Sequence, residues 1–186
     1  MVIDLFISVI ILTFGIHQES NKLTSIGLIS DTHHFLDEQV FTYFKDCDEI
    51  WHAGDIGSIQ IANNLASFKP FRAVYGNIDG SDIQNIYPEY LRWHCEGVGV
   101  FMTHIGGYPG KYVPWVKKEI IEHPTKLFIS GHSHILRVIF DQKLNCLHMN
   151  PGAAGKQGWH KIRTIIRFAI DGSAIKNCEV IEMVKR

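Results

Sequence analysis

From Ser25 onward, short apolar runs alternate with segments whose apolar residues recur at helical spacing. The first three runs cover residues 25–30, 48–53 and 71–76, and the segments between them are 37–46 and 59–68. Such alternation predicts βαβ units, in which helices connect the strands of a parallel sheet. The first half of the chain is therefore expected to be α/β.

The pattern changes in the second half of the chain. Residues 89–104 are predicted to form two strands joined through a Glu-Gly turn, and 115–123 a helix that Pro124 ends. Five further strands are expected at 126–131, 136–141, 145–150, 161–170 and 174–184. An Asp-Gly-Ser sequence joins the last two and is typical of a hairpin turn. We expect a mixed α/β sandwich of two facing sheets with helices outside.

Length and charge fit a single domain with no general affinity for polyanions. The chain has 186 residues, with 18 Lys and Arg against 19 Asp and Glu, a formal net charge of −1. No global charge draws it to nucleic acid or anionic membrane. The four cysteines lack ligand spacing and indicate reduced thiols in a cytosolic protein, so a cytoplasmic location is expected.

The N-terminal segment is set apart by its apolar character. Residues 2–16 are almost wholly apolar but too short to predict a membrane span. They also lack the basic start and cleavage site of a signal peptide. We interpret residues 1–24 as an extension or an over-extended gene start, with a membrane anchor as the alternative, and residues 25–186 as the domain.

Metal-ligand residue types follow five of the predicted strands. The segments are Asp31–His33, Gly54–Gly57, Gly76–Asp79, Thr103–His104 and Gly131–His134. Functional groups of parallel sheets gather beyond the carboxyl ends of the strands, so these side chains are expected to lie close together. Their carboxylate, amide and imidazole groups suit manganese, iron or zinc better than calcium or a thiolate zinc site.

The patterns D-x-H, G-D-x-G, G-N-x-D, T-H and G-H-x-H, in this order, resemble those of the calcineurin-like metallophosphoesterases. Within that superfamily the chain is similar to the small phosphodiesterases of the YfcE type, which also tend to carry the N-P-G found at residues 150–152. The resemblance extends from Ser25 to the C-terminus. It implies a four-layer αββα sandwich of two mixed sheets flanked by helices.

The resemblance also implies two divalent metal ions per protomer, held by seven residues. One ion would be bound by Asp31, His33, Asp55 and His134, and the other by Asp55, Asn77, His104 and His132, so that Asp55 bridges. Manganese is the first choice of metal, with iron, zinc, nickel or magnesium as alternatives. Such a pair could hydrolyse a small phosphodiester by attack of a bridging hydroxide, with Asp55, Asn77 and His104 in the catalytic centre.

Two positions depart from the wider pattern. His34 stands where relatives usually have a small residue; it is either a solvated loop imidazole or a catalytic group beside the substrate phosphate. Ile78 stands where many wider relatives have a proton-donating His, although the YfcE-type proteins lack that His too. His52 lies within a predicted strand and is expected to be packed or to support the site rather than bind metal.

Two rival functions remain open. The retromer scaffold subunit shares this small fold and is thought to act as a binding surface, but its ligand set is incomplete, whereas the set here appears complete. Larger nucleases of the superfamily act on nucleic acid, but the neutral net charge favours a small phosphoester as partner. The sequence leaves the oligomeric state and the physiological substrate open.

Overall fold

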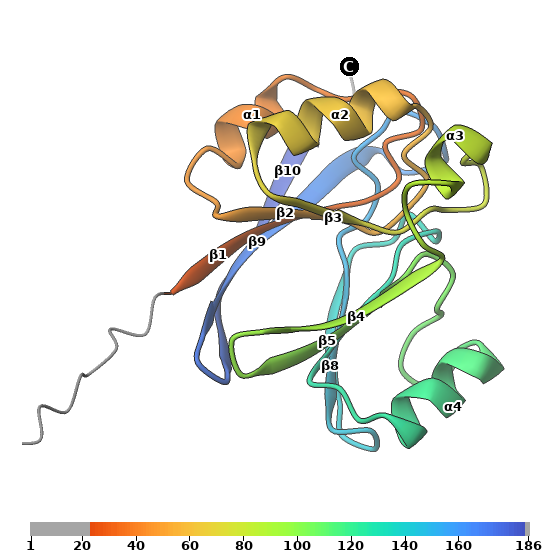
Figure 1. Ribbon diagram of the computed structural model, residues 1–186, viewed down its shortest axis with the longest axis vertical. Helices are drawn as coiled ribbons and strands as arrows, with labels where there is room; N and C mark the ends of the chain where they lie inside the picture. Colours follow the sequence, from red (N-terminus) through yellow and green to blue (C-terminus); the bar gives the residue numbers. More distant parts are fainter. Residues whose placement is uncertain (1–22, 185–186) are drawn as a thin grey trace, which may run out of the picture.

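Two five-stranded sheets form the centre of the computed structural model, which describes residues 23–184 (Figure 1). The first sheet has the order β10 (Ala174–Val184), β9 (Ile162–Asp171), β1 (Thr24–Ile29), β2 (Glu49–His52) and β3 (Phe71–Ala73). The second has the order β4 (Tyr90–Cys95), β5 (Val98–Thr103), β6 (Leu127–Ile129), β8 (Cys146–Asn150) and β7 (Arg137–Asp141). Both sheets are mixed: β1, β2 and β3 run parallel, as do β5, β6 and β8, and the remaining pairs are antiparallel.

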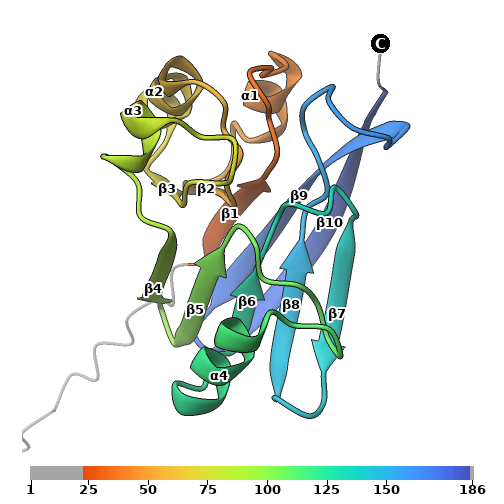
Figure 2. The ribbon, with the colours of Figure 1, turned by 90° about the vertical axis from the view of Figure 1, so that its right-hand side faces the viewer.

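Helices cover the outer faces of the sheets. The helices are α1 (Gln39–Tyr43), α2 (Ile59–Phe68), α3 (Ser81–Gln84) and α4 (Pro114–Glu122). Figure 1 shows α1 and α2 against the first sheet, and Figure 2 shows α4 in front of the second. This confirms the predicted four-layer sandwich.

Alternating side chains of single strands explain the layers. In β5, Val100 and Met102 belong to the core between the sheets, whereas Phe101 packs under α4. In β1, Leu28 faces the other sheet and Ile29 packs under α1 and α2. Successive residues of a strand point to opposite faces, so a strand that is apolar throughout is buried on both sides.

Several predicted elements are shorter than expected, α1 and β3 among them, and the short helix α3 was not predicted. The first helix begins at Gln39 because Asp37 accepts a hydrogen bond from its backbone N–H and pairs with Arg163 instead of joining the helix. The strand predicted over 71–76 ends at Ala73, because the N–H of Tyr75 turns away to the carbonyl of Pro88.

The predicted extension lies outside the described residues except for its last two positions. Within residues 23–184, no helix is long and apolar enough to cross a membrane.

Candidate metal centre

Six of the predicted metal ligands converge in two groups at the carboxyl ends of the strands. The groups are Asp31, His33 and His134, and Asp55, His104 and His132. Within each group, one ligand atom from every residue lies within 4.8 Å of the others. The residues lie in the loops after β1 and β2 of the first sheet and after β5 and β6 of the second. Each group therefore contains residues from both sheets.

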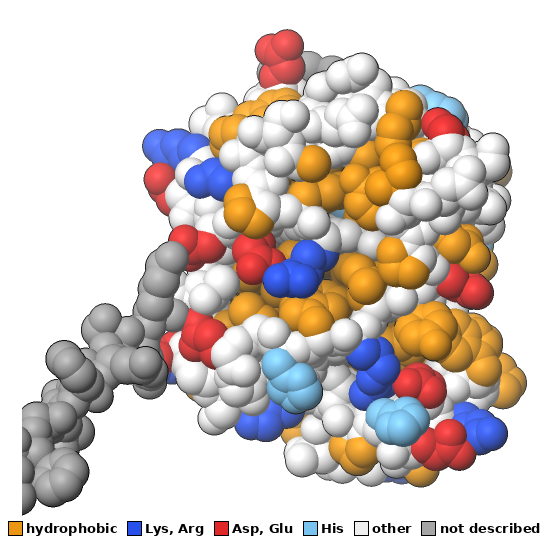
Figure 3. Space-filling view, viewed as in Figure 1, with side chains coloured by type: hydrophobic (Ala, Val, Ile, Leu, Met, Phe, Trp, Pro, Cys, Tyr) orange, Lys and Arg blue, Asp and Glu red, His pale blue; other side chains and the backbone are white. Residues whose placement is uncertain are grey.

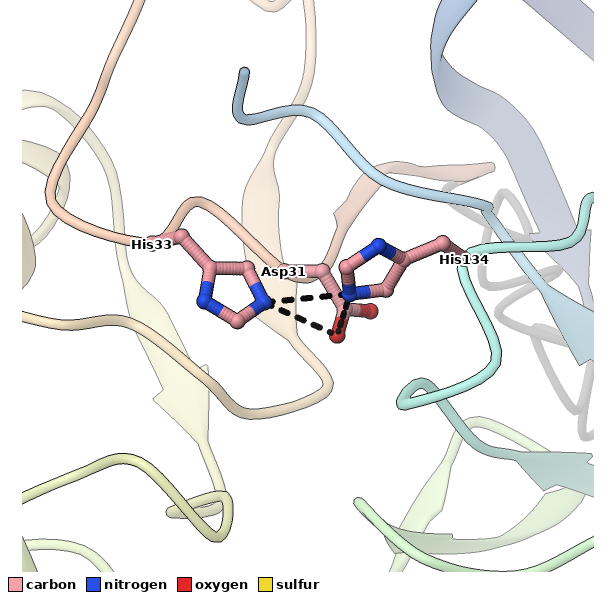
Figure 4. Close-up of side chains that lie close together, drawn as sticks. All are labelled: Asp31, His33 and His134. Carbon is pink, nitrogen blue, oxygen red and sulfur yellow. Dashed lines mark hydrogen bonds and ion pairs between the residues drawn. The ribbon is translucent and has the colours of Figure 1, made fainter. Parts of the chain in front are cut away.

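The first group is held by close contacts between its ligand atoms (Figure 4). His134 Nε2 lies 3.2 Å from Asp31 Oδ1. His33 Nε2 lies 3.0 Å from His134 Nε2 and 3.8 Å from Asp31 Oδ1. One carboxylate oxygen and two imidazole nitrogens therefore face a common point.

Asp55 lies between the two groups. Its Oδ2 is 3.2 Å from His104 Nε2 in the second group and 3.5 Å from His33 Nε2 in the first. Its Oδ1 accepts a hydrogen bond from the Ile78 N–H at 3.0 Å, which leaves Oδ2 directed at the imidazoles. A single carboxylate is thus placed to contribute to both groups.

Two buried atoms that face the other ligands, Asp31 Oδ1 and His104 Nε2, lack hydrogen-bond partners. Asp31 Oδ2 accepts from the Ser30 hydroxyl at 2.6 Å and the His132 N–H at 3.2 Å, but Oδ1 accepts none. His104 Nδ1 donates to the Ala53 carbonyl at 2.8 Å, while Nε2 makes no hydrogen bond. Buried polar atoms normally have hydrogen-bond partners, and a hydrogen bond from the other ring nitrogen to a backbone carbonyl is what orients metal-binding imidazoles. The residues present therefore fit divalent metal ions.

The protonation of the imidazoles reflects burial and the two carboxylates. Burial lowers the pKa of His33 and His132 more than the nearby Asp55 and Asp31 raise it, which favours the neutral form that binds metals. Burial also acts on His104, but there the two carboxylates outweigh it and raise the pKa. Burial alone would raise the pKa of Asp55, but the neighbouring His104 and the Ile78 N–H together lower it.

The backbone of the centre is strained at its ligands. Five of the seven predicted ligands have φ between 44° and 65°, namely Asp31, His33, Asp55, His132 and His134. Residues other than glycine rarely adopt this left-handed conformation, and where they do the surroundings must hold them there. Such strain clusters at functional sites, and here it coincides with the converging side chains.

Glycines allow the loops to approach the ligands. A Cβ at Gly76 would lie 2.0 Å from Asp55 Oδ1, and one at Gly54, where φ is 94°, would lie 2.6 Å from His104 Nδ1. Neither ligand can retreat from such a contact, because each is anchored by a hydrogen bond to backbone. Gly54 of G-D-x-G and Gly76 of G-N-x-D are therefore required, because a side chain at either position would collide with a ligand.

Asp79 supports the centre, although sequence reasoning gave it no role. Its buried carboxylate accepts three backbone hydrogen bonds, from Ile56 at 3.1 Å, Gly57 at 2.7 Å and Gly76 at 2.8 Å. It thereby ties the loop that carries Asp55 to the loop after β3. The only sequence signal for this role is that Asp79 is the last residue of the G-N-x-D pattern.

Three further buried polar residues brace the ligand loops. His52 accepts the Gly54 N–H through Nδ1 and contacts the Thr32 hydroxyl through Nε2 at 3.1 Å, and burial lowers its pKa to about 3. Thr32 in turn donates to the Ile56 carbonyl at 2.8 Å. Asn150 of the N-P-G segment donates to the Gly131 carbonyl at 2.8 Å and so supports the loop that carries two histidines.

The remaining predicted site residues lie at the periphery. Asn77 is exposed and, with His104, lines a cavity beside the second group. His34 is exposed, and within the described residues its imidazole belongs to neither group. Its backbone N–H donates to the Ile56 carbonyl.

Sequence comparison finds the same family that the motifs indicate. A family model described as the calcineurin-like phosphoesterase superfamily domain matches residues 25–173. A protein of Methanothermobacter thermautotrophicus named "Probable metallophosphoesterase" is 32% identical over 136 residues, which are 69% of this chain and 76% of that protein.

Structure comparison finds proteins of the same fold. Vacuolar protein sorting 29 from Cryptosporidium parvum superposes with a TM-score of 0.69 at 17% identity, covering 88% of this chain and 99% of that one. A predicted phosphoesterase of Streptococcus pneumoniae superposes with a TM-score of 0.63 at 20% identity, covering 88% and 90% of the two chains. At such identities the likeness establishes the fold alone.

Proposed function

Because the chain belongs to the calcineurin-like phosphoesterase superfamily, we propose that it is a metal-dependent hydrolase of small phosphodiesters. The observation that carries the proposal is the position of Asp55 between two groups of ligand atoms, beside buried atoms of Asp31 and His104 that lack hydrogen-bond partners. Two divalent ions, manganese in the first instance, account for this arrangement.

Each ion would have four protein ligands. The first would be held by Asp31, His33, Asp55 and His134, and the second by Asp55, Asn77, His104 and His132. Bound divalent ions would supply Lewis-acid chemistry, polarising a phosphoryl oxygen and lowering the pKa of a water molecule.

The protein's own residues prepare and limit the reaction. The Ala53 carbonyl fixes the His104 ring with Nε2 toward the centre, and Ser30 fixes the Asp31 carboxylate, so little reorganisation is needed during turnover. Ile78, next to the exposed Asn77, has no proton to give to a leaving group. Substrates whose leaving groups need no protonation are therefore favoured. For other substrates the proton would come from water, from a metal-bound water or from the exposed His34.

The four cysteines, which form no disulfide, support a reducing compartment such as the cytoplasm as the protein's location.

The experiment is an activity assay of purified protein loaded with manganese, with bis(p-nitrophenyl) phosphate as substrate. We expect metal-dependent hydrolysis that chelation with EDTA abolishes and renewed manganese restores. Replacement of Asp55 by Asn should remove most of the activity because it weakens both ligand groups. Activity that survives both treatments would contradict the proposal.

A scaffold role is the second candidate, because a vacuolar protein sorting subunit has the same fold. The complete set of ligand-type residues argues for catalysis instead. A protein that binds metal but hydrolyses no phosphoester in a broad screen would favour the scaffold.

A further inference from the structure

A cavity of about 300 Å³ adjoins the second ligand group. It shares Asn77 and His104 with the centre, so a molecule bound there would reach the metal ligands directly. The other walls come from the loop after β3, the residue before β4, the end of β5 and the first turn of α4. The volume is at the lower end of ligand pockets and suits one ring system.

Two aromatic residues line this cavity. They are Tyr75 and Trp115, and Trp115 is 39% exposed. The indole is held in place by ring contacts with Tyr90 at 5.9 Å and Phe101 at 6.1 Å. Figure 3 shows hydrophobic side chains gathered at the surface around α4 on this side of the molecule. Rigid aromatic walls of this kind suit stacking with a flat ring.

One acidic residue also lines the cavity. Glu89 is exposed and forms no ion pair with a lysine or arginine among residues 23–184. The Thr103 hydroxyl donates to the Glu89 backbone carbonyl at 3.1 Å, which fixes this position against the end of β5. A carboxylate accepts hydrogen bonds only, so it selects a ring with a donor group.

We infer that the substrate carries a flat aromatic base with an exocyclic amino group, and that this base binds between Tyr75 and Trp115 with its amino group toward Glu89. The inference rests on the proposed phosphodiesterase function, since it places the base beside Asn77 and His104. The phosphodiester would then lie over the ligand groups.

Nucleosides test the cavity without any phosphate chemistry. Dissociation constants of cytidine, uridine and ribose would be measured by NMR titration of the full chain. The two nucleosides differ at two neighbouring ring positions: cytidine has an amino donor at C4 and an acceptor N3, whereas uridine has a carbonyl acceptor at C4 and an N3–H donor. With C4 directed at Glu89, only cytidine offers the carboxylate a donor there. We expect cytidine to bind more tightly than uridine, and ribose not to bind measurably.

Variants assign the binding to the cavity. Trp115→Ala should weaken cytidine binding by at least about fivefold, the lower end of the range for base stacking. Phe140→Ala removes an aromatic side chain that is 55% exposed on β7, outside the cavity, and should leave binding unchanged. Glu89→Gln should remove the preference for cytidine over uridine. Trp115→Phe keeps a flat ring and should retain binding if the alanine variant is unstable.

Two results would overturn the inference: equal affinity for cytidine and uridine in the unaltered protein, or equal losses in Trp115→Ala and Phe140→Ala. A parallel assay with bis(p-nitrophenyl) phosphate separates this inference from the proposed function. Hydrolysis without nucleoside binding would overturn the inference alone, whereas nucleoside binding without hydrolysis would support the base cavity and overturn the hydrolase proposal.

Discussion

Replacing Asp79 by Asn should loosen the metal centre although Asp79 is not one of its ligands. The carboxylate accepts the N–H groups of Ile56 and Gly76 on Oδ2 and that of Gly57 on Oδ1. Asparagine has only one acceptor oxygen. If that oxygen serves Ile56 and Gly76, the amide nitrogen faces the N–H of Gly57 and cannot bond to it.

The magnitude follows from these three bonds. A hydrogen bond to a charged group contributes about 1.5–3 kcal/mol, and a neutral one about 1 kcal/mol. One bond is lost and two are weakened from charged to neutral, so the free energy of unfolding should fall by about 2.5–7 kcal/mol. Because the same bonds hold the loop of Asp55, manganese affinity should fall about 10–100-fold, as for other residues that orient ligands.

Urea denaturation of the metal-free protein measures the first effect, and manganese titration measures the second. The matched control is Asp82→Asn, which makes the same chemical change at an exposed position on α3 and should alter neither quantity by much. A loss of stability below about 0.5 kcal/mol in Asp79→Asn, or unchanged manganese affinity, would refute the reasoning.

Three further predictions concern the site and the N-terminal segment. Gly76→Ala should lower manganese affinity and turnover at least about tenfold, because its Cβ would collide with the Asp55 carboxylate. Unchanged manganese affinity would contradict this, because it would show that the loop can move to make room for the methyl group. Aryl phosphodiesters should be cleaved faster than alkyl monoesters, since Ile78 donates no proton; a wide margin in favour of monoesters would contradict this. A chain that starts at Leu23 should keep metal binding and turnover, measured beside its melting temperature, and a folded but inactive product would refute the assignment of the domain to residues 25–186.

The sequence predicted the layers and the convergence of ligands because both depend on local patterns. The strand Val98–Thr103 is apolar up to its last residue and so indicates burial on both faces. Ligand types at successive strand ends likewise predict a shared edge, and the structure groups six of the seven predicted residues there, with Asn77 beside them.

What the sequence missed depends on contacts between distant loops or on very short elements. The role of Asp79 arises from bonds to residues 22 and 23 positions earlier, which no local pattern shows. The helix Ser81–Gln84 has four residues, too few to show helical periodicity. The left-handed conformation of Asp31 and His134 was also not predictable, because it is imposed by the surrounding fold.

The central claim is that the two ligand groups joined by Asp55 hold two metal ions. Its most direct test is the metal content of manganese-loaded, desalted protein, measured by inductively coupled plasma mass spectrometry for the unaltered chain and for Asp55→Asn. We predict two ions per chain in the unaltered protein and a clear loss in the variant. A stoichiometry of one or less in the unaltered protein would contradict the claim.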